Sequence, residues 1–329
     1  MGHIYKMKHP EVFQGSLKSK QYFEGWYFKI IDASAQNIYA FIIGVSLEKQ
    51  TSLSHAFIQY FNATEHCAYY FKYPVNEFFG STVKCEIKID KSIFSSDKIA
   101  LNIDQEGQCI QGELTFSDLV PLPKQGIGHG IMGIASYLPK LQCRHGIVSL
   151  NHNLKGTLVV NGEEKEFTGG KGYLEKDWGS SFPAAYIWMQ TNNFEKDDLS
   201  LVGSIATVPI LGIKVRAWFI VFLYNGKVIR FTNYNGAKIR MQLLEETHTI
   251  FTVSKGKFEL EIDGVKTPGI DLPSPSGGGM KSKISESLTS TIYIRYYEEK
   301  GHQKHLLYEG AGYPAGLEIQ ATREALKLA

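Results

Sequence analysis

The chain has 329 residues, of which 43% are hydrophobic and 21% charged, a balance typical of a globular protein with room for two domains. Its formal net charge of +2 gives no strong field, so we expect no nucleic-acid partner. The longest apolar runs, Tyr39–Val45 and Ala217–Tyr224, fall far short of the ~20 residues that a membrane-spanning helix needs. The first ten residues lack the apolar stretch of a secretory signal, so we expect a cytoplasmic protein.

The cysteines show no pattern that indicates a metal site. Cys67, Cys85, Cys109 and Cys143 are scattered, and none belongs to a Cys-x-x-Cys or Cys/His pair. We therefore expect inert, reduced thiols, no metal and no other cofactor, and nothing in the sequence indicates an obligate protein partner.

Aromatic residues make up 12% of the chain and stand among β-branched residues and frequent turn signals, which favours strands over helices. In the first half, the predicted strands recur every ten to fifteen residues. They are Tyr22–Ile31, Ile38–Leu47, His55–Phe61, Cys67–Tyr73, Val83–Ile89, Ile99–Ile103, Cys109–Phe116, His145–Leu150 and Lys155–Val160. This rhythm predicts a sandwich or barrel of antiparallel neighbours.

The segment Leu119–Leu141 is apolar but is interrupted by prolines and glycines, so it predicts a long loop that covers another part of the protein. It fits a lid that plugs one end of a barrel, a gate, or a loop that makes transient contact with a membrane surface.

Two Asn-Gly pairs, Asn161-Gly162 and Asn225-Gly226, predict tight hairpins in the middle and second half of the chain. Further strands are expected at Val215–Tyr224, Lys227–Thr232, Ile239–Leu244, Thr249–Val253, Phe258–Ile262, Ser290–Tyr297 and Leu306–Glu309. The Pro/Gly-rich stretch Pro268–Gly279 predicts a flexible surface loop, and the composition of Glu318–Ala329 favours a short helix. Together these patterns predict a mostly-β protein with little helix and two barrel-like domains, residues 1–180 and 181–329, with the boundary placed to within about 15 residues.

Polar and aromatic side chains concentrate in Gly172–Asn192, near the predicted boundary. With the period-two alternation of a strand, Glu175 and Asp177 share one face with Tyr173, while Lys176 shares the other with Leu174 and Trp178. After Pro183 the alternation places Tyr186, Trp188, Gln190 and Asn192 on one face. In the first strand, Glu24 stands with Trp26.

Several of these pieces are similar to the tocopherol cyclase family. They are Phe23–Lys29 (FEGWYFK), His145–Ser149 (HGIVS), Gly172–Gly179 (GYLEKDWG) with Phe182-Pro183, Trp188–Asn192 (WMQTN) and Tyr308–Gly312 (YEGAG). Their order is kept along almost the whole chain. The resemblance implies a tandem lipocalin-like fold, as in carotenoid hydratase relatives, with a nonpolar cavity for a prenylated substrate. It also implies an activity that closes a ring by adding a phenol across a prenyl double bond, a prenyl quinol being the substrate of the plant enzymes.

Closing such a ring requires a proton donor, stabilisation of a tertiary cation and a base for the phenolic proton. Asp177, Glu175 and Glu24 are the candidate donors, since burial or a neighbouring acid raises a carboxyl pKa. The same acids would equally form a structural salt-bridge cluster, with Lys176 pairing Glu24.

The candidate substrate-binding residues are aromatic and polar. Trp26, Trp178 and Trp188 would offer π faces to the cation or would only fill a core. Gln190 and Asn192 would orient a phenol or quinone oxygen. His145, His152 or His55 would accept the phenolic proton.

Two functions fit these features: an enzyme that cyclises, hydrates or isomerises a prenyl-type double bond, and a non-catalytic binder or carrier of a hydrophobic small molecule or lipid. A third, an interaction protein, would have a filled interior.

Overall fold

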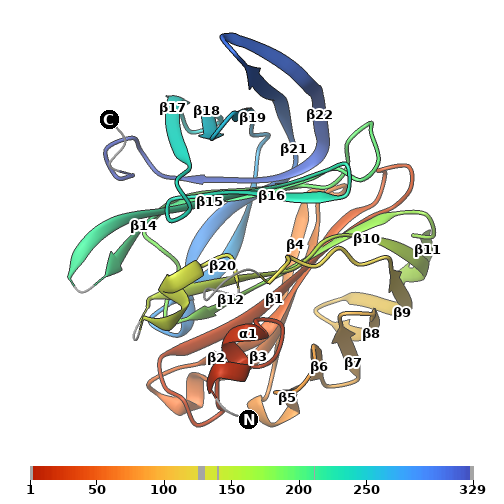
Figure 1. Cartoon of the computed structure of the whole chain (residues 1–329). Helices are drawn as coiled ribbons and strands as arrows, with labels where there is room; N and C mark the ends of the chain where they lie inside the picture. Colours follow the sequence, from red (N-terminus) through yellow and green to blue (C-terminus); the bar gives the residue numbers. More distant parts are fainter. Residues whose placement is uncertain (1–2, 125–129, 139–140, 211, 327–329) are drawn as a thin grey trace. The chain divides into compact units, whose positions relative to one another are not determined.

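The computed structural model describes residues 3–124, 130–138, 141–210 and 212–326, which form a mostly-β protein (Figure 1). The chain divides into two compact units. Unit 1 comprises Met1–Phe182 with Pro273–Lys283, and unit 2 comprises Pro183–Leu272 with Ile284–Ala329. None of the described helices has the length and apolarity that crossing a membrane requires.

Unit 1 begins with the short helix α1 (His3–Lys8) and then contains strands of three to eighteen residues. The strands are β1 (Tyr22–Ile31), β2 (Ile38–Leu47), β3 (His55–Asn62), β4 (Cys67–Tyr73), β5 (Phe78–Gly80), β6 (Glu86–Ile89), β7 (Ser92–Ser95), β8 (Lys98–Gln105), β9 (Gln108–Ser117), β10 (Cys143–Val160), β11 (Glu163–Glu166) and β12 (Lys171–Gly179). Three 3-10 turns separate some of them: η1 (Thr51–Leu53), η2 (Val75–Glu77) and η3 (Gly133–Tyr137).

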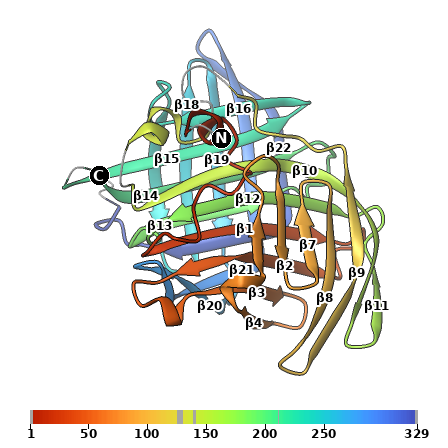
Figure 2. The same cartoon turned by 90° about the horizontal axis from the view of Figure 1, so that it is seen from below.

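These strands pair antiparallel in the order β4-β3-β2-β1-β12-β10-β9-β8-β7-β6-β5, with β11 on β10. β1 therefore lies between β2 and β12, although β12 follows it by about 140 residues. Figure 2 shows β1, β12 and β10 side by side. Among the described residues, no hydrogen-bonded pairing joins β4 to β5, the two ends of this order.

One face of the unit 1 sheet carries the core. On β1, Trp26, Phe28 and Ile30 point into it and Leu174 of β12 joins them, because directly paired residues of neighbouring strands share a face. The opposite face of the same strands carries Tyr27 and Glu175, which are also buried. Both faces of β1 and β12 are thus shielded from solvent, and this places buried polar side chains on the second face.

Unit 2 is built around a ten-stranded antiparallel sheet with the order β16-β15-β14-β13-β22-β21-β19-β18-β17, and β20 pairs with β21. The strands are β13 (Ala185–Thr191), β14 (Ser200–Ile210), β15 (Ile213–Tyr224), β16 (Lys227–Thr232), β17 (Lys238–Leu244), β18 (His248–Lys255), β19 (Phe258–Val265), β20 (Ile270–Ser276), β21 (Gly279–Lys300) and β22 (Gln303–Gln320). The end of β20 and the start of β21 fall within Pro273–Lys283 and so belong to unit 1. Asn225 and Gly226 both have positive φ in the turn between β15 and β16, as the hairpin signal predicted.

Three local predictions were wrong. Pro268–Gly279 is not a flexible loop: it contains β20, whose Leu272 is buried, and the turn into β21 uses the positive φ of Gly277 and Gly278. The expected helix at the C-terminal end does not form in the described residues, because Glu318–Gln320 complete β22 in pairing with β13.

The two strands expected at His145–Leu150 and Lys155–Val160 are one continuous strand, β10. Register shifts around Ser149 let it run past Asn151 and His152, so the polar residues that suggested a break are accommodated inside the strand.

Candidate active site

Two carboxylates and a histidine meet where β10 and β12 pair. Asp177 of β12 is directly opposite His145 of β10 and opposite Gly25 of β1, while Glu175 is opposite Ile147 and Tyr27. Since Glu175 and Asp177 are two residues apart on one strand, their side chains and that of His145 share the second, core-distal face of the sheet. The prediction that Tyr173, Glu175 and Asp177 share one face agrees with this register.

The imidazole of His145 lies between the two acids. Its Nδ1 is 3.0 Å from Oδ1 of Asp177, and its Nε2 is 3.4 Å from Oε2 of Glu175. The hydroxyl of Tyr173 donates a hydrogen bond of 2.5 Å to Oε2 of Glu175. We call Tyr173, Glu175, His145 and Asp177 the acid cluster. Side-chain exposure rises from 5% at Glu175 through 12% at His145 to 23% at Asp177, so the cluster runs from a buried end to a partly accessible one.

Electrostatics in the cluster favour a charged histidine. Burial lowers the pKa of His145, but the negative charges of Asp177 and Glu175 more than offset this and raise it to about 9. Burial and the neighbouring acid Glu175 raise the pKa of the Tyr173 hydroxyl, and burial and Asp177 do the same for the Cys143 thiol, so both stay protonated. The expected repulsion between the two acids is therefore relieved by an imidazolium between them.

The same three side chains are the described residues that best match a metal site, since one ligand atom from each of His145, Glu175 and Asp177 lies within 4.8 Å of the others. The orientation of the ring does not suit this role. Nδ1 faces one carboxylate and Nε2 faces the other, so a single ring nitrogen does not converge with both acids on one point. This arrangement suits shared protons better than a shared cation.

Glu24 lies elsewhere, on the core face of β1, where it forms an ion pair with the ammonium group of Lys176. Both side chains are fully buried. The carboxylate also accepts hydrogen bonds from Tyr22 Oη and from two backbone N–H groups, those of Gln14 (2.7 Å) and Gly15 (2.9 Å). The structure thus separates Glu24 from Glu175 and Asp177, and the pairing of Lys176 with Glu24 that the sequence suggested is present.

Lys176 is held by backbone oxygens and aromatic rings as well. Its Nζ donates to the carbonyls of Pro10 (2.9 Å) and Val12 (2.5 Å). It also lies 4.5 Å from the ring centroid of Trp26 and 4.9 Å from that of Trp178. The π faces that we expected to meet a substrate cation therefore already meet a lysine ammonium. Burial lowers the pKa of Lys176 despite the neighbouring Glu24.

These contacts fasten residues 5–15, which we call the N-terminal segment, onto β1, β10 and β12. The indole N–H of Trp26 donates to the Glu11 carbonyl at 2.9 Å. Pro10 packs on Gly146 so closely that a Cβ added there would lie 2.5 Å from the Cβ of Pro10. A side chain at position 146 would displace the segment, so the glycine allows β10 to be covered.

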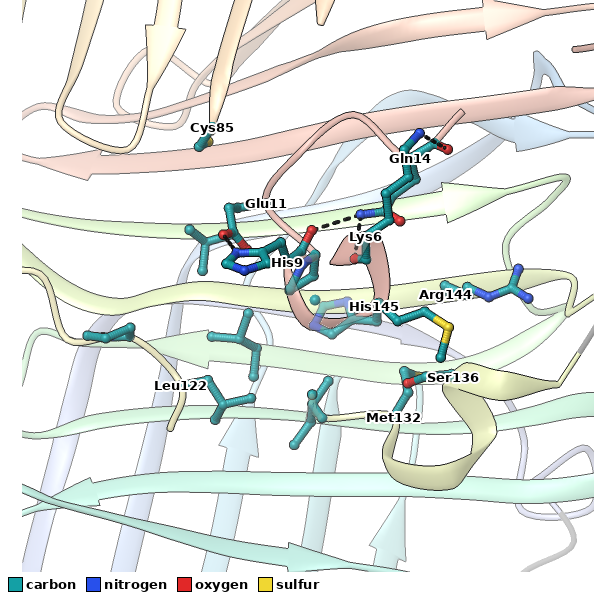
Figure 3. Close-up of a pocket in the computed structure, with 18 of the residues that line it drawn as sticks. Lys6, His9, Glu11, Gln14, Cys85, Leu122, Met132, Ser136, Arg144 and His145 are labelled. Atoms are coloured by element: carbon teal, nitrogen blue, oxygen red, sulfur yellow. Dashed lines mark hydrogen bonds and ion pairs between the residues drawn. The ribbon is translucent and has the colours of Figure 1, made fainter. Parts of the chain in front are cut away.

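A cavity of about 830 Å³ lies beside this segment (Figure 3). Its wall combines the N-terminal segment with residues 83–85, residues 119–124 and 130–136, and Arg144–Val148 of β10. Leu122, Ile131 and Met132 are among its apolar residues. Leu119–Leu141 therefore covers a cavity in the part that the structure describes, while residues 125–129 and 139–140 of this segment lie outside the described residues. His145 belongs both to the cavity lining and to the acid cluster.

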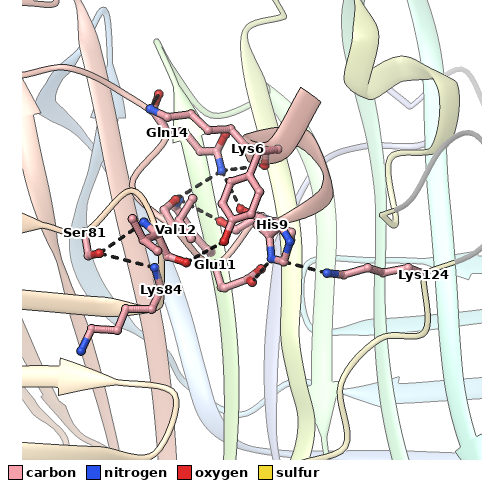
Figure 4. A network of polar contacts seen from close by, with 12 residues as sticks. Lys6, His9, Glu11, Val12, Gln14, Ser81, Lys84 and Lys124 are labelled. Carbon is pink, nitrogen blue, oxygen red and sulfur yellow. Dashed lines mark hydrogen bonds and ion pairs between the residues drawn. The ribbon is translucent and has the colours of Figure 1, made fainter. Parts of the chain in front are cut away.

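A polar network borders the cavity (Figure 4). Nδ1 of His9 is 2.7 Å from Glu11 and 3.4 Å from Nζ of Lys124, while the side-chain amide of Gln14 donates to three backbone carbonyls, Lys6, His9 and Val12. These bonds hold the irregular chain after α1 in a fixed path.

Trp188, Gln190 and Asn192 are in unit 2. β13 points Ala185, Ile187 and Met189 into the unit 2 core, and so the other face carries Tyr186, Trp188 and Gln190, as the alternation predicted. All three candidates are buried, and Nε2 of Gln190 donates to Oδ1 of Asn192 at 3.2 Å.

Two other histidines take structural positions. His152 is buried, with Nδ1 3.1 Å from the Ser149 hydroxyl and its ring 4.5 Å from that of Phe116. Burial lowers its pKa to about 3, so it is neutral at physiological pH. His55 forms a hydrogen bond of 2.8 Å with Tyr70.

Sequence reasoning missed the contribution of the N-terminal segment and of Arg144 to the cavity. Residues 1–20 show no regular hydrophobic periodicity. The sequence therefore offered no signal that their backbone forms hydrogen bonds with the buried ion pair of Glu24 and Lys176.

Comparisons with known proteins give a consistent result. A family model described as tocopherol cyclase-like matches residues 117–321. Among curated proteins, "Probable tocopherol cyclase, chloroplastic" of Oryza sativa subsp. japonica is 22% identical over 172 residues, which cover 50% of this chain and 36% of the rice protein. The match thus spans only about a third of the rice protein.

Two solved structures share the fold. A Nitrosomonas europaea protein provisionally named AttH aligns with a TM-score of 0.51 at 15% identity, covering 90% of this chain and 92% of that one. CghA, solved with Sch210972, aligns with a TM-score of 0.57 at 9% identity, covering 92% and 89%. The family model covers more than half of the sequence and includes the strands of the acid cluster, which confirms the resemblance seen in the sequence: the chain belongs to the tocopherol cyclase-like family.

Proposed function

We propose that the protein is an acid–base enzyme that adds a proton to a carbon–carbon double bond of a hydrophobic substrate and thereby cyclises, hydrates or isomerises it. One observation carries this proposal: a histidine held between two carboxylates forms part of the wall of a largely apolar cavity. Membership of the tocopherol cyclase-like family supports ring closure among these outcomes, with a prenyl phenol or quinol as the substrate.

Asp177 is the proposed proton donor because it is the most accessible acid of the cluster. The proton that His145 holds passes to the Asp177 carboxylate 3.0 Å away, and Asp177 transfers it to the less substituted alkene carbon, so that the tertiary cation forms at the other carbon. The substrate hydroxyl, or a water molecule, then forms the C–O bond. The proton that this oxygen loses returns to the Asp177 carboxylate, so the cycle consumes no oxidant or reductant.

His145 and Glu175 prepare Asp177 for this step. The imidazole of His145, 3.0 Å from Asp177, holds the proton that Asp177 delivers and takes it up again at the end of the cycle. Glu175, bonded to the Tyr173 hydroxyl, keeps the imidazole charged from the buried side.

We also propose that each unit is a lipocalin-like barrel. In unit 1, β3 lies against β6 and η2, so the two ends of the strand order approach one another, and in unit 2, β16 lies against β18 near the opposite end of its sheet. A barrel of this kind encloses a single small ligand, in keeping with the size of the cavity.

Turnover of a panel of prenylated phenols by Asp177→Asn and Glu175→Gln tests the proposal. We expect kcat to fall by at least ~100-fold in Asp177→Asn, the usual scale for loss of a general acid, with a smaller loss in Glu175→Gln. Asp263→Asn is the matched control, because Asp263 forms a histidine pair with His248 at 2.8 Å in unit 2. It should keep wild-type turnover. Dialysis against EDTA should also leave the rate unchanged.

Unchanged turnover in both cluster variants would remove the acid assignment. If the wild-type protein binds these phenols but converts none of them, the carrier function replaces the enzyme.

A further inference from the structure

Arg144 gives the cavity a positive group that forms no ion pair with a carboxylate in the part of the chain that the structure describes. It precedes His145 on β10, lines the cavity and is half-buried. Its Nη2 donates to the carbonyl of Leu138 at 2.7 Å. Within the described ranges, no carboxylate lies within ion-pair distance of the guanidinium, although burying an arginine without an acid is costly. Burial lowers its pKa, which reflects this cost.

The rest of the lining adds positive charge. Lys6, Lys84 and Lys124 belong to it, whereas Glu11 is its one carboxylate among the described residues, and Glu11 is bonded to His9. Lys84 is paired with Glu86, and Lys6 donates to the Gln14 carbonyl at 2.8 Å. Arg144 therefore remains the cation of the wall with the most donors left, since a guanidinium has five N–H groups.

Apolar residues and cationic residues line the same cavity. In Figure 3, Leu122 and Glu11 lie toward one side, and Arg144 lies toward the other with Ser136 near it. Met132, Ile131 and Val148 supply apolar surface. A ligand that fits this wall has a hydrocarbon body and one anionic end.

We propose that Arg144 binds a carboxylate of the substrate, so that the hydrophobic substrate of the proposed reaction is amphipathic and carries a carboxylic acid in addition to its prenyl-type hydrocarbon body. The planar guanidinium matches a carboxylate in a two-bond geometry. A phosphate ester would bring more charge than Arg144 alone neutralises, and the lysines of the wall already have partners: Lys84 pairs with Glu86, Lys6 bonds the Gln14 carbonyl and Lys124 contacts His9. This inference rests on the proposed function, because it concerns the same cavity, but it requires only binding and no turnover.

The test compares farnesoic acid with its methyl ester, which has nearly the same shape and no charge. Binding is measured at pH 7.5 by isothermal titration calorimetry, with farnesyl diphosphate as a third ligand. We expect the acid to bind wild-type protein about tenfold more tightly than the ester, the scale of one charge-assisted hydrogen-bonded contact. Arg144→Gln should remove that preference and leave ester binding unchanged.

Two further variants keep the test decisive. Arg144→Lys retains the positive charge and should retain part of the preference for the acid over the ester. If Arg144→Gln binds neither ligand, the lysine variant still tests whether the charge at position 144 sets that preference. Arg295→Gln removes a surface arginine that pairs with Glu261 at 2.9 Å and should behave as wild type. Equal binding of acid and ester by the wild type, survival of the preference in Arg144→Gln, or tighter binding of the diphosphate would each overturn the carboxylate assignment. None of these results depends on catalysis, so the proposed function stands or falls separately.

Discussion

The charge of His145 depends on its neighbouring carboxylates more than on its burial. With a pKa of about 9, the ring is positively charged at neutral pH. We predict that NMR titration finds this histidine still protonated at pH 8, and that Asp177→Asn lowers its pKa by more than one pH unit, because one of the two attracting charges is gone. A wild-type pKa below 7 would contradict this account of the cluster.

The raised pKa of His145 also determines how its contribution to folding stability changes with pH. The folded pKa exceeds the unfolded value of about 6.5, so this stabilisation is complete below pH 6.5 and is lost as the pH rises through about 9.

The lowered pKa of His152 gives the opposite pH dependence of folding stability. Its folded pKa of about 3 lies below the unfolded value, so its contribution is complete above about pH 6.5 and is lost as the pH falls toward 3. We predict that urea unfolding of the wild type loses roughly 1 kcal/mol more per pH unit than His152→Gln between pH 6 and pH 4. Parallel stability curves for the two proteins would show that His152 takes up its proton without unfolding.

Single side chains were predictable from the sequence where strand alternation alone decided their direction. Tyr173, Glu175 and Asp177 share a face, and Lys176 points to the opposite one, as expected. The position of His145 between the acids was not predictable, because it depends on which distant strand pairs with β12 and in which register.

At the scale of elements, the buried pair of Lys176 and Glu24 fixes the N-terminal segment. It connects β1 and β12 and is completed by four backbone groups of that segment, at Pro10, Val12, Gln14 and Gly15. Removing one partner leaves a buried charge and releases several hydrogen bonds. We predict that Lys176→Met lowers the free energy of unfolding by about 3–5 kcal/mol.

Hydrogen exchange separates the local from the global part of that effect. The amides of Gln14 and Gly15 should lose protection in Lys176→Met before those of β12 do. Lys165→Met is the matched control, since Lys165 pairs with the exposed Glu163 and should change stability by less than about 1 kcal/mol. If both lysine variants cost the same, the buried pair does not hold the segment.

Elements were predicted well where apolar alternation is strong and poorly where buried polar residues or prolines interrupt it. β1, β2 and β4 begin and end at the expected residues. β10 was divided in two because Asn151 and His152 suggested a break, and β20 was taken for a loop because of Pro273 and Pro275. Hydrogen bonds and strand pairing with residues far along the chain decide such segments, and local composition does not contain that information.

For the whole molecule, the mostly-β class followed from the sequence and is confirmed, while the set of residues that forms the cavity wall did not follow from it. The family match at residues 117–321 includes the strands of the acid cluster and the loop after β9, yet the N-terminal segment that completes the cavity wall lies before it. The cavity wall is therefore assembled from residues 5–15 as well as from β10. Such an arrangement places His145 of the acid cluster in the wall of a largely apolar cavity, which is the observation that supports the proposed alkene protonation.

The most direct test of the claim that the acid cluster protonates a carbon–carbon double bond is turnover in D₂O with mass spectrometry of the product. If the acid cluster protonates the double bond, a prenylated phenol converted in D₂O gains one deuterium on the formerly unsaturated chain, at a carbon that does not exchange afterwards. Wild-type protein should give this singly labelled product, and Asp177→Asn should give little or none. Product without deuterium at that carbon, or equal labelled product from Asp177→Asn, would contradict the account.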